Sequence, residues 1–459
     1  MSSASIRSTA QRVRLADVVR QRPGNSKLIK GRLQSDPAPG LFPAFSASGQ
    51  DIFCPAAEFE GDAVVVSAVG ARCGKCFLAS GKWTAIANTH VLLPDHSRIN
   101  TKYLWYLVND ERFWIRGGSA QPFVRVKDTL QKDLLLPELH KQRRIVAEIE
   151  KQFSRLDQAV ASLQRVKAQL KRYKASVLKA AVEGRLVETE AERARREGRG
   201  FETGTELAAQ GSANAARGRK PGAALPYETG KQLLERILET RRSQWKGKGK
   251  YKEPAAPETV GLPELPEGWV WVALPQLGEI GRGKSKHRPR DDAKLYGGTY
   301  PFIQTGDVRK SDGSIRDYNQ TYSDFGLQQS RLWPNGTLCI TIAANIAETG
   351  ILALPACFPD SVVGFVSDEP MLTRFVEVFI RTIREKLEQF APATAQKNIN
   401  LATLENIMAP LPPLAEQHRI VAEVDRRLSI VREVEAEVDA NLKRAQALRQ
   451  SVLARAFAA

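Results

Sequence analysis

The chain has 459 residues, 42% of them hydrophobic, so it can form two to four domains with packed cores. Its 68 Lys and Arg residues outnumber its 51 Asp and Glu residues, which gives a formal net charge of +17. This excess favours an acidic partner, with nucleic acid ahead of a membrane surface. No run approaches the roughly 18 apolar residues of a membrane span, and residues 1–14 lack a signal-peptide core. We therefore expect a cytoplasmic protein.

Five cysteines in a chain of this length do not form a disulfide framework, which fits a reducing compartment. Cys73 and Cys76 form one C-x-x-C pair, and Cys54, His90 and His96 are near it in sequence. A closed zinc site needs about four ligands at suitable spacing, and a single pair is weak support for one. We favour a Gly-Lys turn in a β-rich segment and predict no metal site, with zinc as the open alternative.

The chain repeats itself at an offset of 275 residues. "HKQRRIVAEIE" (140–150) matches "AEQHRIVAEVD" (415–425), and "SVLKAAV" (176–182) matches "SVLARAF" (451–457). Residues 136–182 and 411–457 share 15 identities in 47 positions without a gap. Two unrelated segments would rarely keep one register over this length, so we predict two copies of one structural unit.

Both copies of the repeat predict a long helix with a seven-residue apolar seam. In the first copy the seam residues, seven apart, are Ile149, Leu156, Leu163, Leu170 and Val177. In the second copy they are Val424, Val431, Val438, Ala445 and Val452. Such a seam must bury against another helix, and we expect each helix to pair with the other. The alternative is an ordinary helical hairpin.

Charge predicts the direction of this pairing. Residues 140–187 contain 12 basic and 4 acidic side chains, whereas residues 415–459 contain 8 and 7. The basic excess of the first helix lies late, and the acids of the second cluster mid-helix. An antiparallel pair with aligned centres sets position 167 near position 434 and brings unlike charges together.

Each long helix follows a segment of short β-type runs separated by turn residues, such as "DAVVVSAVG" (62–70) and "GTLCITIAA" (336–344). We predict an α+β protein in which two β-rich domains alternate with two long helices, with pseudo-two-fold symmetry. The predicted segments are a β-rich domain (1–135), a helix (136–187), a charged linker with one short helix (188–264), a second β-rich domain (265–410) and a second helix (411–459).

The linker ends in "KGKGKYKEPAAPE", which is basic and then proline-rich. Such composition suits a flexible tether. The basic run is either solvated or in contact with DNA phosphates.

"GEIGRGKS" (278–285) matches the pattern of a phosphate-binding P-loop, G-x-x-x-x-G-K-[ST]. A P-loop needs a helix directly after it, but Pro289 comes four residues after Ser285. The pattern is also absent from the first copy of the repeat. We therefore interpret it as a basic, glycine-rich loop that can follow a DNA backbone, and we predict no catalytic residues. A P-loop ATPase or a nuclease acting alone is the alternative.

Four segments resemble the specificity subunits of type I restriction-modification systems: "LPPLAEQHRIVAEVD" (411–425), "VLKAAVEGRLVE" (177–188), "LPEGWVWVAL" (265–274) and "YPFIQTGDV" (300–308). The resemblance covers nearly the whole chain. It implies two target-recognition domains that each read half of a bipartite, asymmetric DNA site, and an antiparallel coiled coil that sets their spacing. Two methyltransferase subunits, and optionally two restriction subunits, would bind it. S-adenosylmethionine, ATP and Mg would belong to these partners.

The sequence departs from this pattern at two points. Glu416 of "PLAEQ" has Lys141 as its counterpart, which implies either a weaker methyltransferase contact or an exchanged salt bridge. The first domain also lacks an obvious equivalent of "LPEGWVWV", so its first strand is uncertain.

A reader of duplex DNA needs positive charge for phosphates and polar side chains for base edges. The candidate loops carry Ser46, Ser48, Gln50, Arg72 and Lys75 in the first domain and Lys284, Lys286, Arg288, Gln304, Arg309 and Lys310 in the second. Gln121 and Gln396 are further candidates because they recur at matching positions, with capping or packing at the domain–helix junction as the alternative. A coiled-coil scaffold without DNA preference is the second alternative function.

Overall fold

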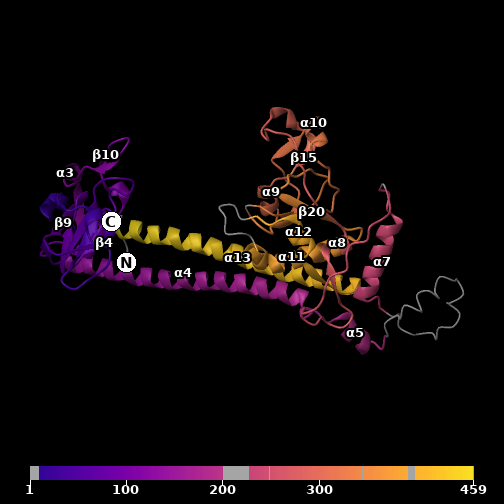
Figure 1. Cartoon of the computed structure of the whole chain (residues 1–459). Helices are drawn as coiled ribbons and strands as arrows, with labels where there is room; N and C mark the ends of the chain where they lie inside the picture. Colours follow the sequence, from indigo (N-terminus) through magenta and orange to yellow (C-terminus); the bar gives the residue numbers. More distant parts are fainter. Residues whose placement is uncertain (1–9, 200–226, 248, 344, 391–397, 458–459) are drawn as a thin grey trace. The chain divides into compact units, whose positions relative to one another are not determined.

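The computed structural model describes residues 10–199, 227–247, 249–343, 345–390 and 398–457. The chain divides into two compact units, which we call the first unit (residues 1–166 with 437–459) and the second unit (residues 167–436). Each unit contains one β-rich domain. The long helices α4 (Leu139–Val182) and α13 (Leu414–Phe457) contribute to both units (Figure 1). Within the described ranges, no helix combines the length and the apolar character that crossing a bilayer requires.

The domain of the first unit is built on two four-stranded sheets, with strand orders β2-β9-β6-β7 and β4-β3-β8-β5. The central strand β6 has the sequence AVVVS and is buried along its whole length, as a run of β-branched residues predicts. Its Val64 and Val66 pack with Leu92 and with Leu104 of helix α2. The strands are β1 (Gln11–Arg14), β2 (Val19–Pro23), β3 (Phe42–Ser46), β4 (Gly49–Cys54), β5 (Phe59–Glu60), β6 (Ala63–Ser67), β7 (Cys76–Ala79), β8 (Lys82–Ala85), β9 (Thr89–Pro94), β10 (Arg116–Gly117), β11 (Phe123–Val124) and β12 (Asp133–Leu136); the helices are α2 (Thr101–Val108) and α3 (Val126–Thr129).

The domain of the second unit is built on a five-stranded sheet with the order β14-β20-β18-β19-β16. Its pairs are antiparallel except for β16 and β19. Apolar residues of α11 cover this sheet and pack with Leu338, Ile340 and Phe365. The strands are β13 (Val270–Ala273), β14 (Glu279–Arg282), β15 (Tyr296–Phe302), β16 (Gly313–Ile315), β17 (Gln320–Tyr322), β18 (Leu338–Thr341), β19 (Thr349–Leu352), β20 (Val362–Val366) and β21 (Met408–Leu411); the helices are α5 (Glu190–Arg196), α7 (Gly230–Ser243), α8 (Leu274–Leu277), α9 (Thr305–Lys310), α10 (Asp324–Gln328), α11 (Pro370–Phe390) and α12 (Leu401–Glu405).

Both domains are closed by the same two-stranded ribbon. Strand β1 pairs with β12 and strand β13 pairs with β21, each antiparallel, and the second strand of each pair leads directly into a long helix. Gln11 pairs with Leu136 and Val270 pairs with Leu411, so β12 and β21 keep the 275-residue offset, whereas β1 and β13 are 259 residues apart. The first domain therefore does have a first strand, β1, which is equivalent to the strand β13 that "LPEGWVWV" leads into.

The sequence equivalence becomes clear once the strands are aligned. Val13, Leu15 and Val18 of the first domain are buried where Val272, Leu274 and Leu277 are buried in the second. In each copy, the last residue of the strand donates its backbone N–H to a side chain three residues further on. Arg14 donates to Asp17, and Ala273 donates to Gln276, both at 2.9 Å. Charged residues between the apolar positions hide this short motif in the sequence.

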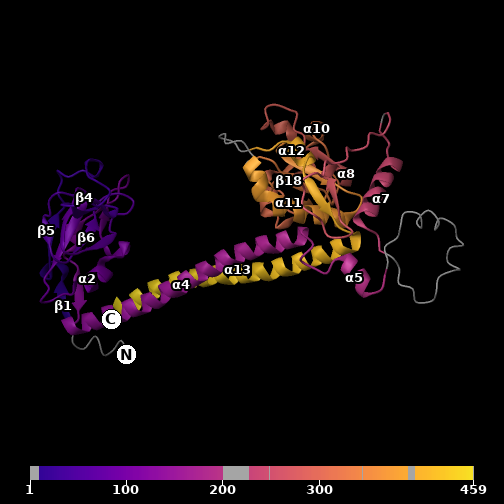
Figure 2. The same ribbon diagram turned by 60° about the horizontal axis from the view of Figure 1, so that its bottom comes forward.

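The long helices pair antiparallel in both units, as predicted (Figure 2). In the first unit Arg449 donates to Asp157 at 2.7 Å, and its guanidinium lies 4.2 Å from the Phe153 ring centroid. In the second unit Lys174 donates to Glu435 at 2.6 Å. From the first contact to the second, the residue number on α4 rises from 157 to 174 while that on α13 falls from 449 to 435. Only an antiparallel pair gives this order. Val177 and Leu178 are buried with Val421, Val424 and Leu428.

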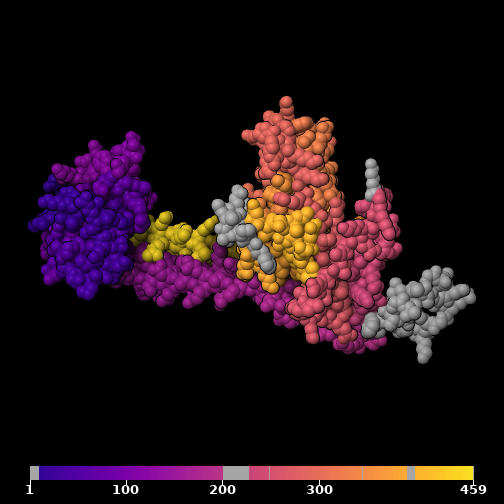
Figure 3. Space-filling view, in the orientation of Figure 1, coloured from indigo at the N-terminus to yellow at the C-terminus, as the bar shows by residue number. Residues whose placement is uncertain are grey.

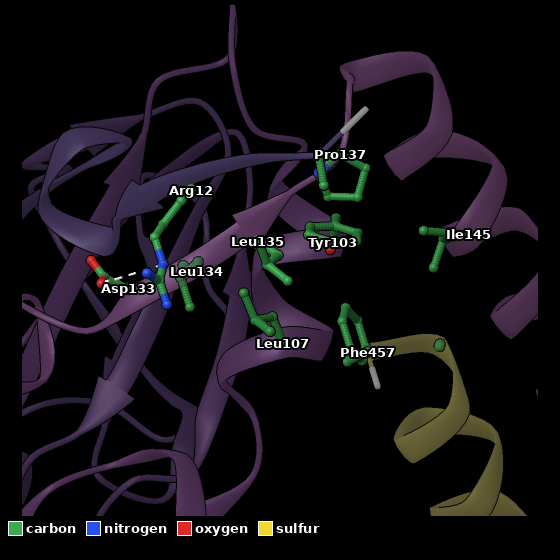
Figure 4. Close-up of a pocket in the computed structure, with 11 residues that line it drawn as sticks. Arg12, Tyr103, Leu107, Asp133, Leu134, Leu135, Pro137, Ile145 and Phe457 are labelled. Carbon is green, nitrogen blue, oxygen red and sulfur yellow. Dashed lines mark ion pairs between the residues drawn. The ribbon is translucent and has the colours of Figure 1, made fainter. Parts of the chain in front are cut away.

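The last turn of α13 docks on the domain of the first unit. The ring centroids of Phe457 and Tyr103 are 5.2 Å apart. Phe457 borders a pocket of about 340 Å³ that Leu107, Pro137 and Ile145 also line (Figure 4). The counterpart of Phe457 in α4 is Val182, which packs against the core of the second unit. Each long helix therefore ends in an apolar contact with a β-rich domain.

Candidate nucleic-acid interface

In the first unit, the turn between β3 and β4 contains three of the predicted DNA-contacting residues. Ser48 and Gln50 are exposed. Ser46 is buried, and its hydroxyl donates to Asp51 Oδ1 at 2.7 Å and accepts the Ser48 N–H at 3.0 Å. Because both bonds of Ser46 lie within the hairpin of β3 and β4, its position suits shaping this hairpin better than touching a base.

A second polar loop, residues 70–75, lies against the hairpin formed by β10 and β11. The Gly70 N–H donates to the Pro122 carbonyl at 2.8 Å, and Val69 bridges to Phe123. Arg72 and Gln121 are exposed on this connected surface. Gln121 thus lies at a hairpin tip and not at the domain–helix junction.

The same surface continues to the turn between β3 and β4. Lys75 Nζ lies 5.8 Å from the Phe77 ring centroid. A Cβ on Gly49 would lie 3.1 Å from the same ring. Three neighbouring loops therefore carry the other predicted DNA contacts of the first unit: the turn between β3 and β4, the loop 70–75 and the hairpin of β10 and β11. These residues are Ser48, Gln50, Arg72, Lys75 and Gln121, all exposed or half-exposed.

Sequence reasoning missed a basic segment at β2. Residues 20–32, "RQRPGNSKLIKGR", contain five cations. A groove of about 510 Å³ runs beside this strand, lined by Gln21, His90, Arg125 and Lys127 among others. The Gln21 Nε2 and His90 Nδ1 atoms are 3.0 Å apart, and burial lowers the pKa of His90. Five cations within 13 residues were a usable signal.

In the second unit, the glycine-rich pattern at 278–285 does not form a phosphate-binding loop. Residues 279–282 are strand β14, which pairs with β20, and the residues after Ser285 form a loop in place of the required helix. A Cβ on Gly283 would lie 2.3 Å from the Phe358 carbonyl oxygen, so this glycine serves close backbone packing.

The loop after β14 presents Lys284, Lys286 and Arg288, all exposed. It is fixed to the α10 region by two bonds, from Ser330 Oγ to the Lys284 carbonyl at 2.8 Å and from the Lys286 N–H to the Gln329 carbonyl at 3.2 Å. The basic side chains therefore project from an ordered loop. This region forms the projecting end of the second unit in the space-filling view (Figure 3).

Amide side chains gather near the start of α9. Gln304 donates to Gln320, and Asn319 Nδ2 donates to Asp307 Oδ1 at 2.6 Å. Asp307 Oδ2 accepts the Gln304 N–H at 2.9 Å, which holds the group together. Amides can bond adenine through two atoms in the major groove. Asn319 and Gln320, which the sequence analysis did not single out, thus join Gln304.

The other candidates of the second unit have a simpler placement. Arg309 and Lys310 are exposed in the last turn of α9. Gln396 lies outside the described residues. The match between Gln121 and Gln396 therefore stays a prediction.

Cys73 and Cys76 are both buried. Cys76 Sγ lies 3.4 Å from the Gly74 and Val108 carbonyl oxygens, and burial raises its thiol pKa. In the described part of the chain, no three His, Cys, Asp or Glu side chains gather as a metal ion would need. This arrangement fits a turn fixed by hydrogen bonds.

Glu416 is fully buried at the start of α13. Its Oε2 accepts the Glu190 N–H at 2.9 Å, at the first turn of linker helix α5. Arg419 pairs with the Glu190 carboxylate at 2.6 Å. Burial raises the pKa of Glu416 to about 7. Glu416 is therefore used in an internal contact between α13 and α5. Whether Lys141 weakens a methyltransferase contact or exchanges a salt bridge stays a prediction.

Residues 266–440 match the family model described as the type I restriction modification DNA specificity domain. The chain is 23% identical over 443 residues to the type I restriction enzyme EcoDI specificity subunit of Escherichia coli, covering 94% of this chain and 85% of that protein. Over nearly its whole length, the chain is therefore similar to the specificity subunits of type I restriction-modification systems. The EcoBI specificity subunit of Escherichia coli is 27% identical over 177 residues, or 37% of this chain and 36% of that protein.

A solved chain from a study of complex assembly and conformational transition of the type I system shares the fold. It is 18% identical, with a TM-score of 0.59 over 98% of this chain and 97% of that one. The predicted fold class is confirmed. The predicted function in DNA specificity is also confirmed, and the specificity-subunit family supplies recognition and not catalysis.

Proposed function

We propose that this specificity subunit reads a bipartite, asymmetric duplex site, with residues 1–135 and 265–410 each reading one half. Residues 136–187 and 411–459 then form the paired helices, and residues 188–264 link the repeats. The observation that carries the proposal is the repeated ribbon and helix start, which frames two different polar surfaces. The same ribbon and helix start, combined with two different polar surfaces, fits a DNA site with two unlike halves.

The two surfaces differ in chemistry. The candidate surface of the first unit joins Arg72 and Lys75 to Ser48, Gln50 and Gln121. That of the second unit combines a basic loop with the amides of Gln304, Asn319 and Gln320. Guanidinium groups favour guanine and amides favour adenine in the major groove. We expect the second half-site to contain adenine contacts made by these amides.

The paired helices offer a surface for partner subunits. Tyr173 and Val434, 44% and 39% exposed, directly precede the bonded Lys174 and Glu435 on their helices. In an antiparallel pair, the residues that precede two facing positions lie on the same side, so both apolar side chains border one groove. Exposed apolar clusters mark protein interfaces.

The repeat predicts a second such groove. Leu448, the counterpart of Tyr173 at the 275-residue offset, is 46% exposed in the first unit. Two related grooves fit two methyltransferase subunits, and optional restriction subunits would join that complex. S-adenosylmethionine, ATP and Mg would be bound by these partners, in the cytoplasm where the host DNA lies.

The test is the modification motif of host DNA, mapped with and without this gene. We expect adenine methylation at a two-part asymmetric motif that disappears when the gene is removed. Equal methylation in both strains would contradict the proposal. Tight ATP binding by the purified chain, abolished by Lys284→Ala, would favour the ATPase alternative. Duplex binding that does not weaken with salt would favour the scaffold.

A further inference from the structure

A short loop after helix α7 carries a dense group of lysines and two aromatic residues. Helix α7 is anchored by Leu233 and Ile237, which are buried in the core of the second unit. Arg241 Nη1 donates to the Pro275 carbonyl at the far end of the helix. The loop therefore starts from a fixed point on the domain.

Three contacts give the loop a defined shape. Trp245 Nε1 donates to the Gly249 carbonyl at 3.2 Å. The rings of Trp245 and Tyr251 meet edge to face, with centroids 5.6 Å apart. Arg242 pairs with Glu253 and so closes the base of the loop. A Cβ on Gly247 would lie 2.2 Å from the Trp245 ring, so glycine lets this ring pack closely on the backbone.

The lysines of this loop point to solvent. Lys246, Lys250 and Lys252 are exposed. No ion pair is found for any of the three with another described residue. Trp245 is 49% exposed beside them. The loop thus presents three unneutralised charges on a shaped turn.

The loop lies on the same side of the second unit as its candidate reading surface. In both ribbon views the carboxyl end of α7 points to the side where α10 lies, away from α5 (Figures 1 and 2). The basic loop after β14 packs on the α10 region. One approaching duplex can therefore meet both basic loops.

We propose that Lys246, Lys250 and Lys252, positioned by Trp245 and Tyr251, form a phosphate-contacting arm that binds the duplex backbone flanking the second half-site. This inference rests on the proposed function of the second domain. Lysine is depleted at the cores of protein–protein interfaces but is a common phosphate ligand. Closely spaced lysines on a glycine-rich turn let the backbone approach the phosphates. The Trp245–Tyr251 contact positions the lysines.

The test compares the full chain with a K246A/K250A/K252A variant in duplex-binding titrations at several salt concentrations. The probes are a duplex with the mapped motif and a random duplex of equal length. Three lost phosphate contacts should reduce the slope of log K against log salt by about 2 to 3. The affinity ratio between the two duplexes should not change, because phosphate contacts carry no sequence information.

Two controls separate a local contact from a change in net charge. A K171A/K179A/K231A variant removes the same charge from other exposed sites of the second unit and should keep the wild-type slope. A duplex that ends at the second half-site should bind the wild-type chain more weakly than one with a long flank, and the arm variant should bind both equally.

Three results would overturn the inference: an unchanged slope in the arm variant, an equal loss in the control variant, or a loss that persists on the trimmed duplex. An arm variant that binds DNA normally but fails to associate with the methyltransferase would also overturn it, in favour of a protein partner. If the wild-type chain binds neither duplex, the proposed function itself fails, and this outcome is distinct.

Discussion

The starts of the two long helices show which parts of the repeat are kept and which diverge. Gln142 donates to the Pro137 carbonyl at 2.8 Å, and its counterpart Gln417 donates to the Pro412 carbonyl at 2.9 Å. Both glutamines are fully buried. The residue before each differs, because Glu416 is buried under α5 whereas Lys141 is only partly buried. The glutamine–proline bond that orients each helix is therefore shared by the two repeats, whereas the contacts of the neighbouring residue differ between them.

The largest expected effect comes from removing the second repeat, so that only the first domain and the first long helix remain. A fragment of residues 1–187 keeps one β-rich domain and one seam helix, so it should pair with a second copy of itself. Such a dimer should read the first half-site twice, as a palindrome. The measurement is the methylation pattern of the fragment expressed with its methyltransferase.

The fragment dimer should be weaker than the native pairing for two reasons. Two helices with 12 basic and 4 acidic side chains each repel one another at low salt. Val182 would also replace the larger Phe457 beside Tyr103. Raising salt should strengthen the dimer while weakening DNA binding. A soluble monomer with methylation only at asymmetric sites would contradict the two-repeat arrangement.

Matched substitutions at the two glutamines sharpen the comparison of the helix starts. Gln142 also donates to the Arg98 carbonyl at 2.9 Å and accepts the Asn100 N–H at 2.8 Å. Gln142→Ala leaves one buried and two partly buried groups unpaired, so it should destabilise the first unit by about 2–4 kcal/mol. Gln417→Ala leaves one such group and should cost about 1–2 kcal/mol. Urea unfolding measures the free energy of unfolding of each variant. Equal losses would show that the two additional bonds of Gln142, to Arg98 and Asn100, contribute nothing.

The buried Glu416 should make the second unit less stable as pH rises, whereas the lowered pKa of His90 gives the first unit the opposite dependence. The pKa of Glu416 is raised to about 7 by burial, so the folded state holds a proton that the unfolded state releases near its ordinary value of 4.5. Stability should be highest below this window and fall as pH rises through it, by at most about 3 kcal/mol. Glu416→Gln should reduce this fall, and the part that remains belongs to Glu377, whose pKa is also raised by burial. Thermal unfolding between pH 5 and 7.5 measures both profiles. Lys141→Gln is the control and should leave the profile unchanged.

The sequence predicted best where the signal is periodic and local. The seam from Ile149 to Val177 specified both the helix and its need for a partner, because a seven-residue repeat is visible in the chain itself. The first strand was missed because β1 is short and half of it is charged, and only its pairing with β12 reveals it. The burial of Glu416 depends on α5, which lies 226 residues away in sequence.

The candidate DNA contacts were harder to predict for the same reason. The loop at Lys284 was found from composition, but the Gln304–Gln320 contact joins the start of α9 to strand β17. Ser46 was chosen as a polar loop residue, although its hydroxyl is used within its own turn. Composition identifies basic loops, whereas long-range pairing decides which polar groups are left for a ligand.

The smallest expected effects concern one ion pair between the helices in each unit, and these pairs compare the units most directly. Lys174 and Glu435 of the second unit are 33% and 27% exposed, whereas Arg449 and Asp157 of the first are 48% and 60% exposed. Exposed pairs contribute about 0.2–1 kcal/mol, so a double-mutant cycle on each should give a coupling in this range. The less exposed pair should couple more strongly and respond less to salt.

Cysteines placed at 157 and 449 should crosslink, because these positions already face one another. Crosslinking between cysteines at 149 and 424 would instead indicate a parallel pair. Because the ion pairs are weak, they set the direction of the helices more than they stabilise them, and reversing both charges of one pair should leave the antiparallel arrangement intact.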